Sequence, residues 1–283
     1  MNSNNIKKKD GKDVLYIFFP QWQGSGSNNT IYYGANKFYQ NIKDSYYFHE
    51  INCLQNEDKY FKNNILFYNT VLNNLKDIIN LIKCKKPSHI FTIGGDCSIE
   101  IGPVSYLNML YNNLGIIWFD AHGDLNIPSE SPSKTFHGMP LRILLGEGDQ
   151  LITENIFKKI NHNQIFLMGI RDIDQKEKEY IGKYNIYSSS HVDESSIRKL
   201  ITSIKSYNFN NIYIHIDLDV LDLKIFNSVK CPTPNGISYN KLIKCIELLK
   251  ENFNIVGSSI VEFTNDINNN ELNMLKKIFP ISN

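Results

Sequence analysis

The segment GIIWFDAHGDLN, residues 115–126, joins an apolar run to a group of ionisable side chains. Residues 116–119 are all apolar, and Asp120, His122 and Asp124 follow them directly. Such a run predicts a buried strand, so the carboxylate of Asp120 is expected at the edge of the hydrophobic core. Burying an ionised carboxylate without a partner costs on the order of several kcal/mol. The segment therefore predicts a cation at the end of this strand.

Short apolar runs alternate with longer amphipathic stretches along the rest of the chain. Strands are expected at residues 14–19, 89–93, 115–119, 164–169, 185–188, 212–218 and 255–262. Helices are expected at residues 34–42, 63–84, 99–111, 156–159, 176–182, 194–206 and 239–251. This alternation predicts βαβ units, and hence an α/β fold with a parallel sheet covered on both faces. In such sheets the ligand lies at the carboxyl ends of the strands.

Composition narrows the class of protein. The 283 residues are 42% apolar with a formal net charge of +1, and no Pro-, Gly- or Ser-rich linker interrupts them. We expect one domain over residues 14–283, after a polar segment, residues 1–13, that is disordered or loosely held. The near-zero charge argues against nucleic acid and membrane surfaces as partners, which leaves small molecules or copies of the chain.

The cysteines and the apolar runs indicate a cellular location. The five cysteines are scattered, with no CxxC pair and no secretory signal before them. This pattern is typical of a protein in the reducing cytoplasm. No apolar run approaches the roughly 20 residues that span a bilayer, so no membrane segment is expected.

Acidic or sulfur-bearing groups follow five of the expected strands. GGDCS follows residues 89–93, DAHGD follows 115–119, IRDID follows 164–169, DLD ends the strand that begins at 212, and Glu262 ends the last strand. One such group alone is explained by an aspartate that caps the next helix. Five groups at the same edge of one sheet favour a shared ligand.

Paired carboxylates in these groups predict a metal centre. Asp217 and Asp219 are two positions apart in an expected strand, which places both side chains on the same face. Asp120 and Asp124 flank His122 on a turn. Four carboxylates and one imidazole suit manganese or magnesium, and they are too many for a single ion. Two divalent cations about 3.5–4 Å apart, sharing a hydroxide, would balance the charge and activate water as a nucleophile.

Several longer motifs make the chain recognisable. DAHGD, FHGMP, HIDLDVLD and CPTPNGIS occur in this order. The chain resembles the ureohydrolase family (arginases, agmatinases and formimidoylglutamases), whose members hydrolyse guanidino or amidino groups at a binuclear manganese centre. The resemblance runs from the first strand to Glu262. It implies a three-layer α/β/α fold with a mainly parallel sheet of about eight strands, two Mn²⁺ per chain, and a homo-oligomer, either a trimer or a hexamer.

The resemblance also implies roles for individual residues. The positions that match metal ligands are Asp120, His122, Asp124, Asp217 and Asp219. His137 matches an active-site histidine that moves protons to the leaving amine, and Glu262 matches the carboxylate that holds the guanidinium. Asp124 would in addition steady the bridging hydroxide. The positions that match contacts to the α-carboxylate or the α-amino group of arginine are Asn126, Ser133, Asp174 and Glu177.

Cys97 departs from the family pattern. The family has GGDHS, whose histidine binds the more exposed metal ion, whereas this chain has GGDCS. Three alternatives follow, because thiolate is a softer ligand than imidazole. Cys97 binds a metal with a changed preference, it stands beside a weakened or single-metal site, or catalysis is lost. His215, on the same strand face as Tyr213 and Asp217, is interpreted as a packing residue, with a place behind the ligands as the alternative.

Substrate choice rests on two loops. GIRDIDQKE, residues 169–177, resembles the arginase segment that contacts the α-amino group, which favours hydrolysis of L-arginine to urea and ornithine. Lys134 and Thr135 stand where arginases usually have Gly and Asn, so the carboxylate-binding loop is altered. Agmatinase and formimidoylglutamase activities therefore remain alternatives. A non-catalytic ureohydrolase-like subunit, with a metal site weakened by Cys97, is the alternative from another class.

Overall fold

The structure is a computed structural model and describes residues 13–26, 28–53 and 59–283. The expectation of a loosely held N-terminal segment concerns residues 1–12 above all, which lie outside the described part. The strands form one sheet in which every neighbouring pair is parallel. The predicted α/β fold with a parallel sheet is thus confirmed.

The sheet has eight strands in the order β2-β1-β3-β8-β7-β4-β5-β6. They are β1 (Val14–Phe19), β2 (Phe48–Glu50), β3 (His89–Gly94), β4 (Leu114–Phe119), β5 (Ile165–Met168), β6 (Tyr187–Ser189), β7 (Asn211–Asp217) and β8 (Asn254–Val261). The sequence predicted all of these strands except β2. This edge strand has only three residues, none of them fully buried, so it carries no apolar run.

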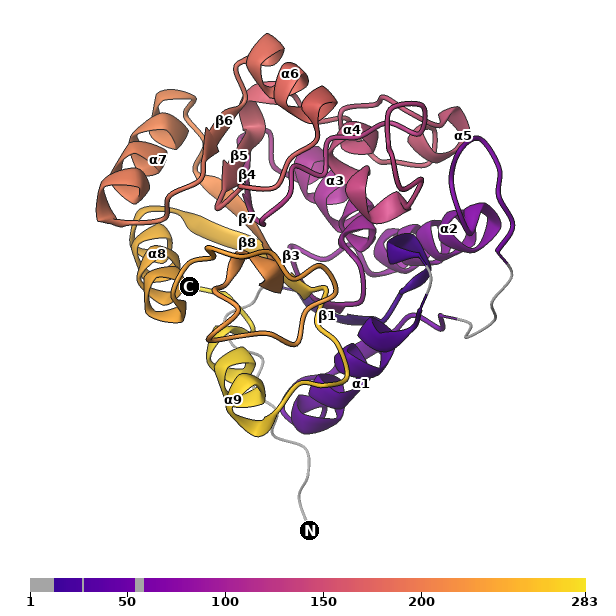
Figure 1. Cartoon of the computed structure of the whole chain (residues 1–283), viewed down its shortest axis with the longest axis horizontal. Helices are drawn as coiled ribbons and strands as arrows, with labels where there is room; N and C mark the ends of the chain where they lie inside the picture. The colour runs from indigo at the N-terminus through magenta and orange to yellow at the C-terminus, as the bar shows by residue number, and fades with distance from the viewer. Residues whose placement is uncertain (1–12, 27, 54–58) are drawn as a thin grey trace.

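Helices cover both faces of the sheet (Figure 1). On one face α2 (Tyr68–Lys85), α3 (Ile101–Leu110), α4 (Pro140–Leu144) and α6 (Gln175–Tyr184) share a hydrophobic core with the strands. A second core lies on the other face, beneath α1 (Thr30–Ile42), α7 (Glu194–Ser206), α8 (Tyr239–Asn252) and α9 (Asn269–Ile278). The layers are therefore α/β/α, as expected.

Helix boundaries differ from the expectation where capping or left-handed backbone intervenes. The helix expected from residue 63 begins at Tyr68, because Asn63, Asn64 and Phe67 have positive φ angles that a right-handed helix cannot contain. No helix forms at residues 156–159. The nearby helix, α5 (Gln150–Thr153), begins where the side chain of Asp149 accepts a hydrogen bond from the Ile152 N–H.

Two further segments differ from the secondary structure expected from the sequence. The Asn-rich segment at residues 268–270 was expected to be a loop, but it contains the start of α9. Asn268 is the N-cap of this helix, and its side chain accepts hydrogen bonds from the N–H groups of Asn270 and Glu271. Helix α4 follows the FHGMP motif and was not predicted, since its five residues are too few to show a helical period.

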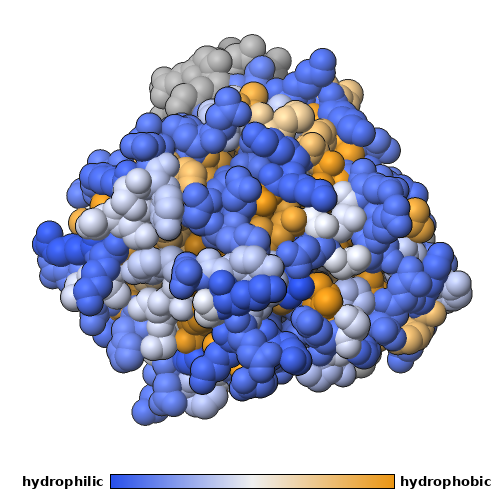
Figure 2. Space-filling model, turned by 90° about the horizontal axis from the view of Figure 1, so that it is seen from above, coloured by the Kyte–Doolittle hydropathy of each residue, from blue (hydrophilic) through white to orange (hydrophobic). Residues whose placement is uncertain are grey.

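No membrane-spanning helix is found in the part of the chain that the structure describes. None of its helices is long and apolar enough to cross a bilayer. The face seen in Figure 2 is mostly hydrophilic, with apolar side chains only in small areas between polar ones.

Candidate metal centre

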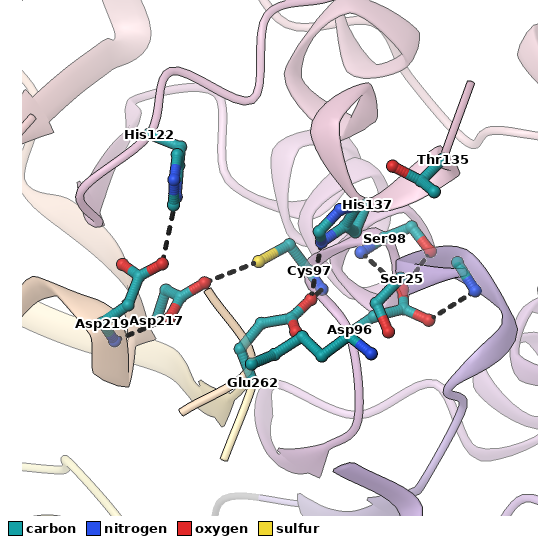
Figure 3. Close-up of polar contacts among 12 residues, drawn as sticks. Ser25, Asp96, Cys97, Ser98, His122, Thr135, His137, Asp217, Asp219 and Glu262 are labelled. Carbon is teal, nitrogen blue, oxygen red and sulfur yellow. Dashed lines mark hydrogen bonds and ion pairs between the residues drawn. The ribbon is translucent and has the colours of Figure 1, made fainter. Parts of the chain in front are cut away.

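The four central strands of the sheet, β3, β8, β7 and β4, bring the predicted ligands to one place. Cys97 begins the short 3₁₀ helix η2 (Cys97–Glu100) after β3, and Asp120 follows β4 directly. Asp217 is the last residue of β7, and Glu262 follows β8. Because these strands are parallel and adjacent, their carboxyl ends meet at one edge, as the sequence predicted (Figure 3).

Asp217 and Asp219 reach the site by a different route from the one expected. Only Asp217 belongs to the strand, and Asp219 lies in the 3₁₀ helix η5 (Leu218–Val220). The carboxylate of Asp217 caps this helix by accepting a hydrogen bond from the Asp219 N–H at 2.8 Å. The chain turns here, so Asp217 points toward Cys97 and Asp219 toward His122 (Figure 3).

The potential ligand atoms form overlapping groups. One group contains Asp120, His122 and Asp219, and another contains Cys97, Asp120, Asp124 and His215. A third contains Cys97, Asp217 and Glu262, and the ligand atoms within each group lie within 4.8 Å of one another. This spacing is roughly the span across one ion, because ligand atoms lie about 2.0–2.3 Å from a bound metal. Asp120 is shared by the first two groups and Cys97 by the last two. A carboxylate has two oxygens that can bind two ions at once, so Asp120 is placed to bridge them.

The charges at the centre support a cation there. Burial raises the pKa of Asp124 well above its ordinary value, and the charge of Asp120 adds to the rise. Burial, and then the neighbouring Asp219, likewise raise the pKa of Asp217. Burial and Asp120 raise the pKa of Asp219 to about 6. Among the described residues, no Lys or Arg side chain forms an ion pair with these carboxylates. A divalent cation would remove the repulsion that opposes their ionisation.

Three buried carboxylate oxygens of the centre lack hydrogen-bond partners within the described part of the chain. They are Oδ2 of Asp124, Oε2 of Glu262 and Oδ2 of Asp219, the last of which has only its ion-pair contact with His122. Asp124 and Glu262 also have left-handed backbone, with φ of 51° and 63° respectively. Non-glycine residues in this region cost on the order of 1 kcal/mol or more and often occur at functional sites. Unpaired oxygens on strained, buried residues fit a site that holds a metal ion or a cationic ligand.

Cys97 lies deeper than expected. Its side chain is 1% exposed, whereas His122 retains 30%. The expectation that position 97 serves the more exposed ion is therefore wrong, since the group with His122 is the one nearer to solvent. The Cys97 thiol donates to Oδ2 of Asp217 over 3.3 Å. Burial, followed by the surrounding carboxylates, raises the pKa of this thiol, so a thiolate would form there only with a cation beside it.

His137 contacts Glu262 at the side of the centre away from His122. Nδ1 of His137 lies 3.0 Å from Oε1 of Glu262, and the ring is one-fifth exposed. Burial lowers the pKa of His137, but the charge of Glu262 and the hydrogen bond to it outweigh this effect and raise the pKa overall. The Cys97 N–H also donates to the same Glu262 oxygen at 3.3 Å. Glu262 is thus held by one oxygen, and its other oxygen stays unpaired.

Residues that the sequence reasoning did not single out support the ligands. Asp96, in GGDCS, is buried and accepts hydrogen bonds from Ser98 and from the Gly24 N–H. A Cβ atom at Gly24 would lie 2.5 Å from this carboxylate, so only glycine fits there. Burial, and then the charge of Glu262, raise the pKa of Asp96 to about 6. The loop PQWQGSG, residues 20–26, therefore packs against the GGDCS turn.

Arg171 was also missed. Its guanidinium donates to the backbone carbonyls of Asp219 at 2.6 Å and Thr233 at 2.9 Å, among others. It therefore joins the turn after β7 to the loop that carries CPTPNGIS. The only signal for Arg171 in the sequence is its place in IRDID, directly before the first aspartate of that motif.

The four residues expected to contact an amino-acid substrate lie in two places. Nδ2 of Asn126 donates to Asp174 at 2.9 Å, and Asp174 is the N-cap of α6. Glu177 is 4% exposed and accepts hydrogen bonds from the N–H groups of Leu125 and Asp174. These three residues thus lie together beside the DAHGD turn. Ser133 is exposed and bonds to Thr135 at 2.6 Å, in the next loop.

Lys134 occupies the altered loop in a left-handed conformation, with φ of 60°. Its ammonium donates to the carbonyl of Pro128 at 3.0 Å, within the same loop. The positive charge is therefore engaged by backbone oxygen atoms of its own segment.

Comparison with known proteins identifies relatives of the chain. A sequence model described as "Arginase family" matches residues 32–275. An arginase of Staphylococcus aureus (strain COL) is 40% identical over 184 residues, which are 63% of this chain and 61% of that protein. The matched part thus spans less than two thirds of the length of this curated relative.

Solved structures with the same fold extend over nearly the whole chain. An Entamoeba histolytica arginase in complex with L-ornithine has a TM-score of 0.83 and 24% identity, with 95% of this chain and 99% of that chain covered. A formimidoylglutamase of Bacillus subtilis has a TM-score of 0.69 and 20% identity, with 95% and 84% covered. At these identities the likeness shows the fold alone, which proteins named for different substrates share.

Proposed function

Because the chain belongs to the arginase family, we propose that it is a metal-dependent hydrolase of a guanidino or amidino compound, with L-arginine as the substrate and urea and ornithine as the products. The observation that carries the proposal is the convergence of buried carboxylates, Cys97 and His122 at the ends of four central strands. Within the described residues, only histidine offers these carboxylates an ion-pair partner.

The residues at the centre fit two divalent cations, which we propose to be Mn²⁺. The group of Asp120, His122 and Asp219, called the His122 half below, offers carboxylates and one imidazole, a donor set that suits Mn²⁺. The group of Cys97, Asp120, Asp124 and His215, called the Cys97 half, includes sulfur, so another divalent metal there, or single occupancy, is the alternative. When bound, the two cations would supply Lewis acidity and ionise a water molecule near neutral pH.

The chain's own residues position the reactants. Oε2 of Glu262 is buried and unpaired, so this carboxylate can accept hydrogen bonds from a planar guanidinium. Asp124 presents a second unpaired oxygen, which can accept a hydrogen bond from the attacking water. His137 lies beside Glu262 and is one-fifth exposed, so its ring can carry a proton to the departing amine. Catalytic roles are accordingly proposed for Asp124, His137 and Glu262.

Support for an amino-acid substrate comes from the loops beside the centre. Asn126 and Asp174 are hydrogen-bonded to each other next to the DAHGD turn, where a substrate carrying both an amino and a carboxylate group would find polar partners. The engagement of the Lys134 ammonium by Pro128 disfavours its use as the carboxylate partner that formimidoylglutamate would need. Relatives named arginase, 40% identical in Staphylococcus aureus, favour the same choice.

The test is product release by the purified protein after incubation with manganese. L-arginine, agmatine and formimidoylglutamate are offered separately, with urea or formamide measured. Urea from L-arginine at least tenfold faster than from agmatine is the expected result. Faster release from agmatine or formimidoylglutamate would change the substrate and keep the hydrolase. No release from any of the three by protein that holds two ions would make the chain a non-catalytic relative.

We further propose that residues 14–283 act as one domain in a cytoplasmic homo-oligomer. Supporting this are the single sheet and the five free cysteines, together with the family resemblance. Light scattering coupled to size-exclusion chromatography is expected to give a trimer or a hexamer, and a monomer would contradict the proposal.

A further inference from the structure

His215 is a buried histidine that lies among the ligands of the Cys97 half. It is 0% exposed and sits on the central strand β7, two residues before Asp217. One of its ring nitrogens lies within 4.8 Å of the ligand atoms of Cys97, Asp120 and Asp124. The sequence suggested core packing or a place behind the ligands for this residue, but its position is in the group itself.

The two ring nitrogens of His215 have different surroundings. Nδ1 lies 3.3 Å from Oε1 of Glu100 and 3.3 Å from Oγ of Ser259. Nε2 is buried and has no hydrogen-bond partner among the described residues. A buried polar atom without a partner costs about 1–3 kcal/mol. A core histidine that served packing alone would be expected to satisfy both nitrogens.

Residues behind His215 hold the ring in place. Trp118 stacks on it, with ring centroids 3.6 Å apart and an interplanar angle of 16°. Glu100 is itself 0% exposed and accepts a hydrogen bond from the hydroxyl of Tyr213. A carboxylate next to the non-ligating nitrogen is the usual support of a metal-binding histidine, because it fixes the tautomer that leaves the other nitrogen free. Glu100 and Trp118 thus place the ring with Nδ1 beside a carboxylate, and Nε2 has no hydrogen-bond partner among the described residues.

We infer that His215 binds, through Nε2, the metal ion of the Cys97 half, and so supplies the imidazole that the family carries at position 97. The ion would then have sulfur from Cys97, nitrogen from His215 and oxygen from Asp120 and Asp124. This inference rests on the proposed metal centre. It accounts for Cys97 without loss of the site, because the imidazole would come instead from β7, which β8 separates from β3 in the sheet.

The donor set directs the choice of probe. A thiolate and an imidazole on one ion favour a softer cation than Mn²⁺. Co²⁺ is therefore used, because its absorption spectrum reports thiolate and imidazole ligation without any substrate. The number of ions per chain is measured by elemental analysis after removal of free metal.

The central variant is His215→Ala, and the matched control is His162→Ala. His162 is also stacked on an aromatic ring, Tyr184, with centroids 3.9 Å apart, and it is not part of a ligand group of the described residues. We expect two Co²⁺ per chain in the original protein and in the control, but one in His215→Ala. The cobalt–thiolate band should be lost only in His215→Ala.

A rescue variant guards against a folding defect. The double variant Cys97→His, His215→Ala returns an imidazole to position 97, and we expect it to regain the second ion without the thiolate band. Two ions and an unchanged spectrum in His215→Ala would overturn the inference and leave the proposed hydrolase intact. If the variants lose metal as expected but the original protein hydrolyses no guanidino compound, the proposed function is overturned and the inference about His215 stands.

Discussion

The two halves of the metal centre differ in depth and in the chemistry of their ligands. The His122 half has carboxylates and an imidazole that is 30% exposed, and it keeps the family motif. In the Cys97 half all four residues are 4% exposed or less, and one donor is sulfur. Fully buried and closely packed side chains have little room to move, whereas a partly exposed histidine on a turn can adjust. The deeper half therefore depends on residues from neighbouring strands to compensate for a changed ligand.

The largest loss of metal and activity is expected from a substitution at the ligand that the two halves share. Asp120 belongs to both groups, so Asp120→Asn should remove ions from both halves and reduce kcat/KM by roughly a thousandfold or more, equivalent to about 4 kcal/mol. Metal analysis and urea release measure this. Asp172→Asn is the matched control, because Asp172 is 69% exposed and lies 3.8 Å from the His122 ring. Two ions retained by Asp120→Asn would mean that the halves are independent.

A smaller effect is expected at a residue that belongs to neither half. His137→Ala should lower kcat by about a hundredfold, the lower end of the usual contribution of a positioned acid or base, and leave two ions per chain. Its contact is with Glu262, 3.0 Å away, so metal binding has no direct reason to change. Steady-state kinetics and elemental analysis check both parts. Loss of an ion together with activity would place His137 among the ligands instead.

Glu177 supports the turn that carries Asp124, and its ionisation offers a test by pH. Burial raises the pKa of Glu177 from 4.5 to about 7, although hydrogen bonds from the backbone of Leu125 and Asp174 oppose the rise. Each pKa unit is about 1.4 kcal/mol, so the shift corresponds to about 3 kcal/mol. Because the folded pKa is the higher one, this stability is present below about pH 4.5 and is lost as the pH rises through about 7.

Glu177→Gln should remove this dependence, since an amide does not titrate. Denaturant unfolding of the metal-free protein at about pH 4.5 and about pH 8 measures the change in the free energy of unfolding. The original protein is expected to lose about 3 kcal/mol more than the variant between these values. Equal losses would show that Glu177 is ionised to the same extent in the folded and unfolded chains.

The smallest expected effect is a change in metal affinity that distinguishes the two halves directly. Cys97→Ser keeps the size of the side chain but replaces sulfur with a harder atom, so it should weaken one metal site by about 10–100-fold and leave the other unchanged. His122→Ala should weaken the opposite site. Calorimetric titration with Co²⁺ resolves the two sites. If both variants weaken the same site, the division into halves is wrong.

The convergence of the candidate ligands was largely predictable because it depends on strand ends. Apolar runs that stop at Asp120 and Asp217 are visible in the sequence, and parallel strands must bring such ends together. The same logic could not find β2 or α4, which are too short to show a period. It also placed Asp219 in the strand, because the capping of η5 by Asp217 depends on a turn that alternation alone does not show.

The sequence could not predict how deeply each candidate ligand is buried. Cys97 and His122 both follow apolar strands, yet the first is buried at the start of η2 and the second remains partly exposed. His215 illustrates the same limit. Its place in a strand of buried residues is typical of packing, and only the positions of neighbouring strands put its ring nitrogen within reach of Cys97.

The most direct test of the central claim is anomalous X-ray scattering from crystals grown with a divalent metal. The account predicts two peaks about 3.5–4 Å apart. One should lie beside His122 and Asp219, and the other beside Cys97 and Asp124. A single peak beside His122, with the Cys97 thiol still hydrogen-bonded to Asp217, would contradict the account.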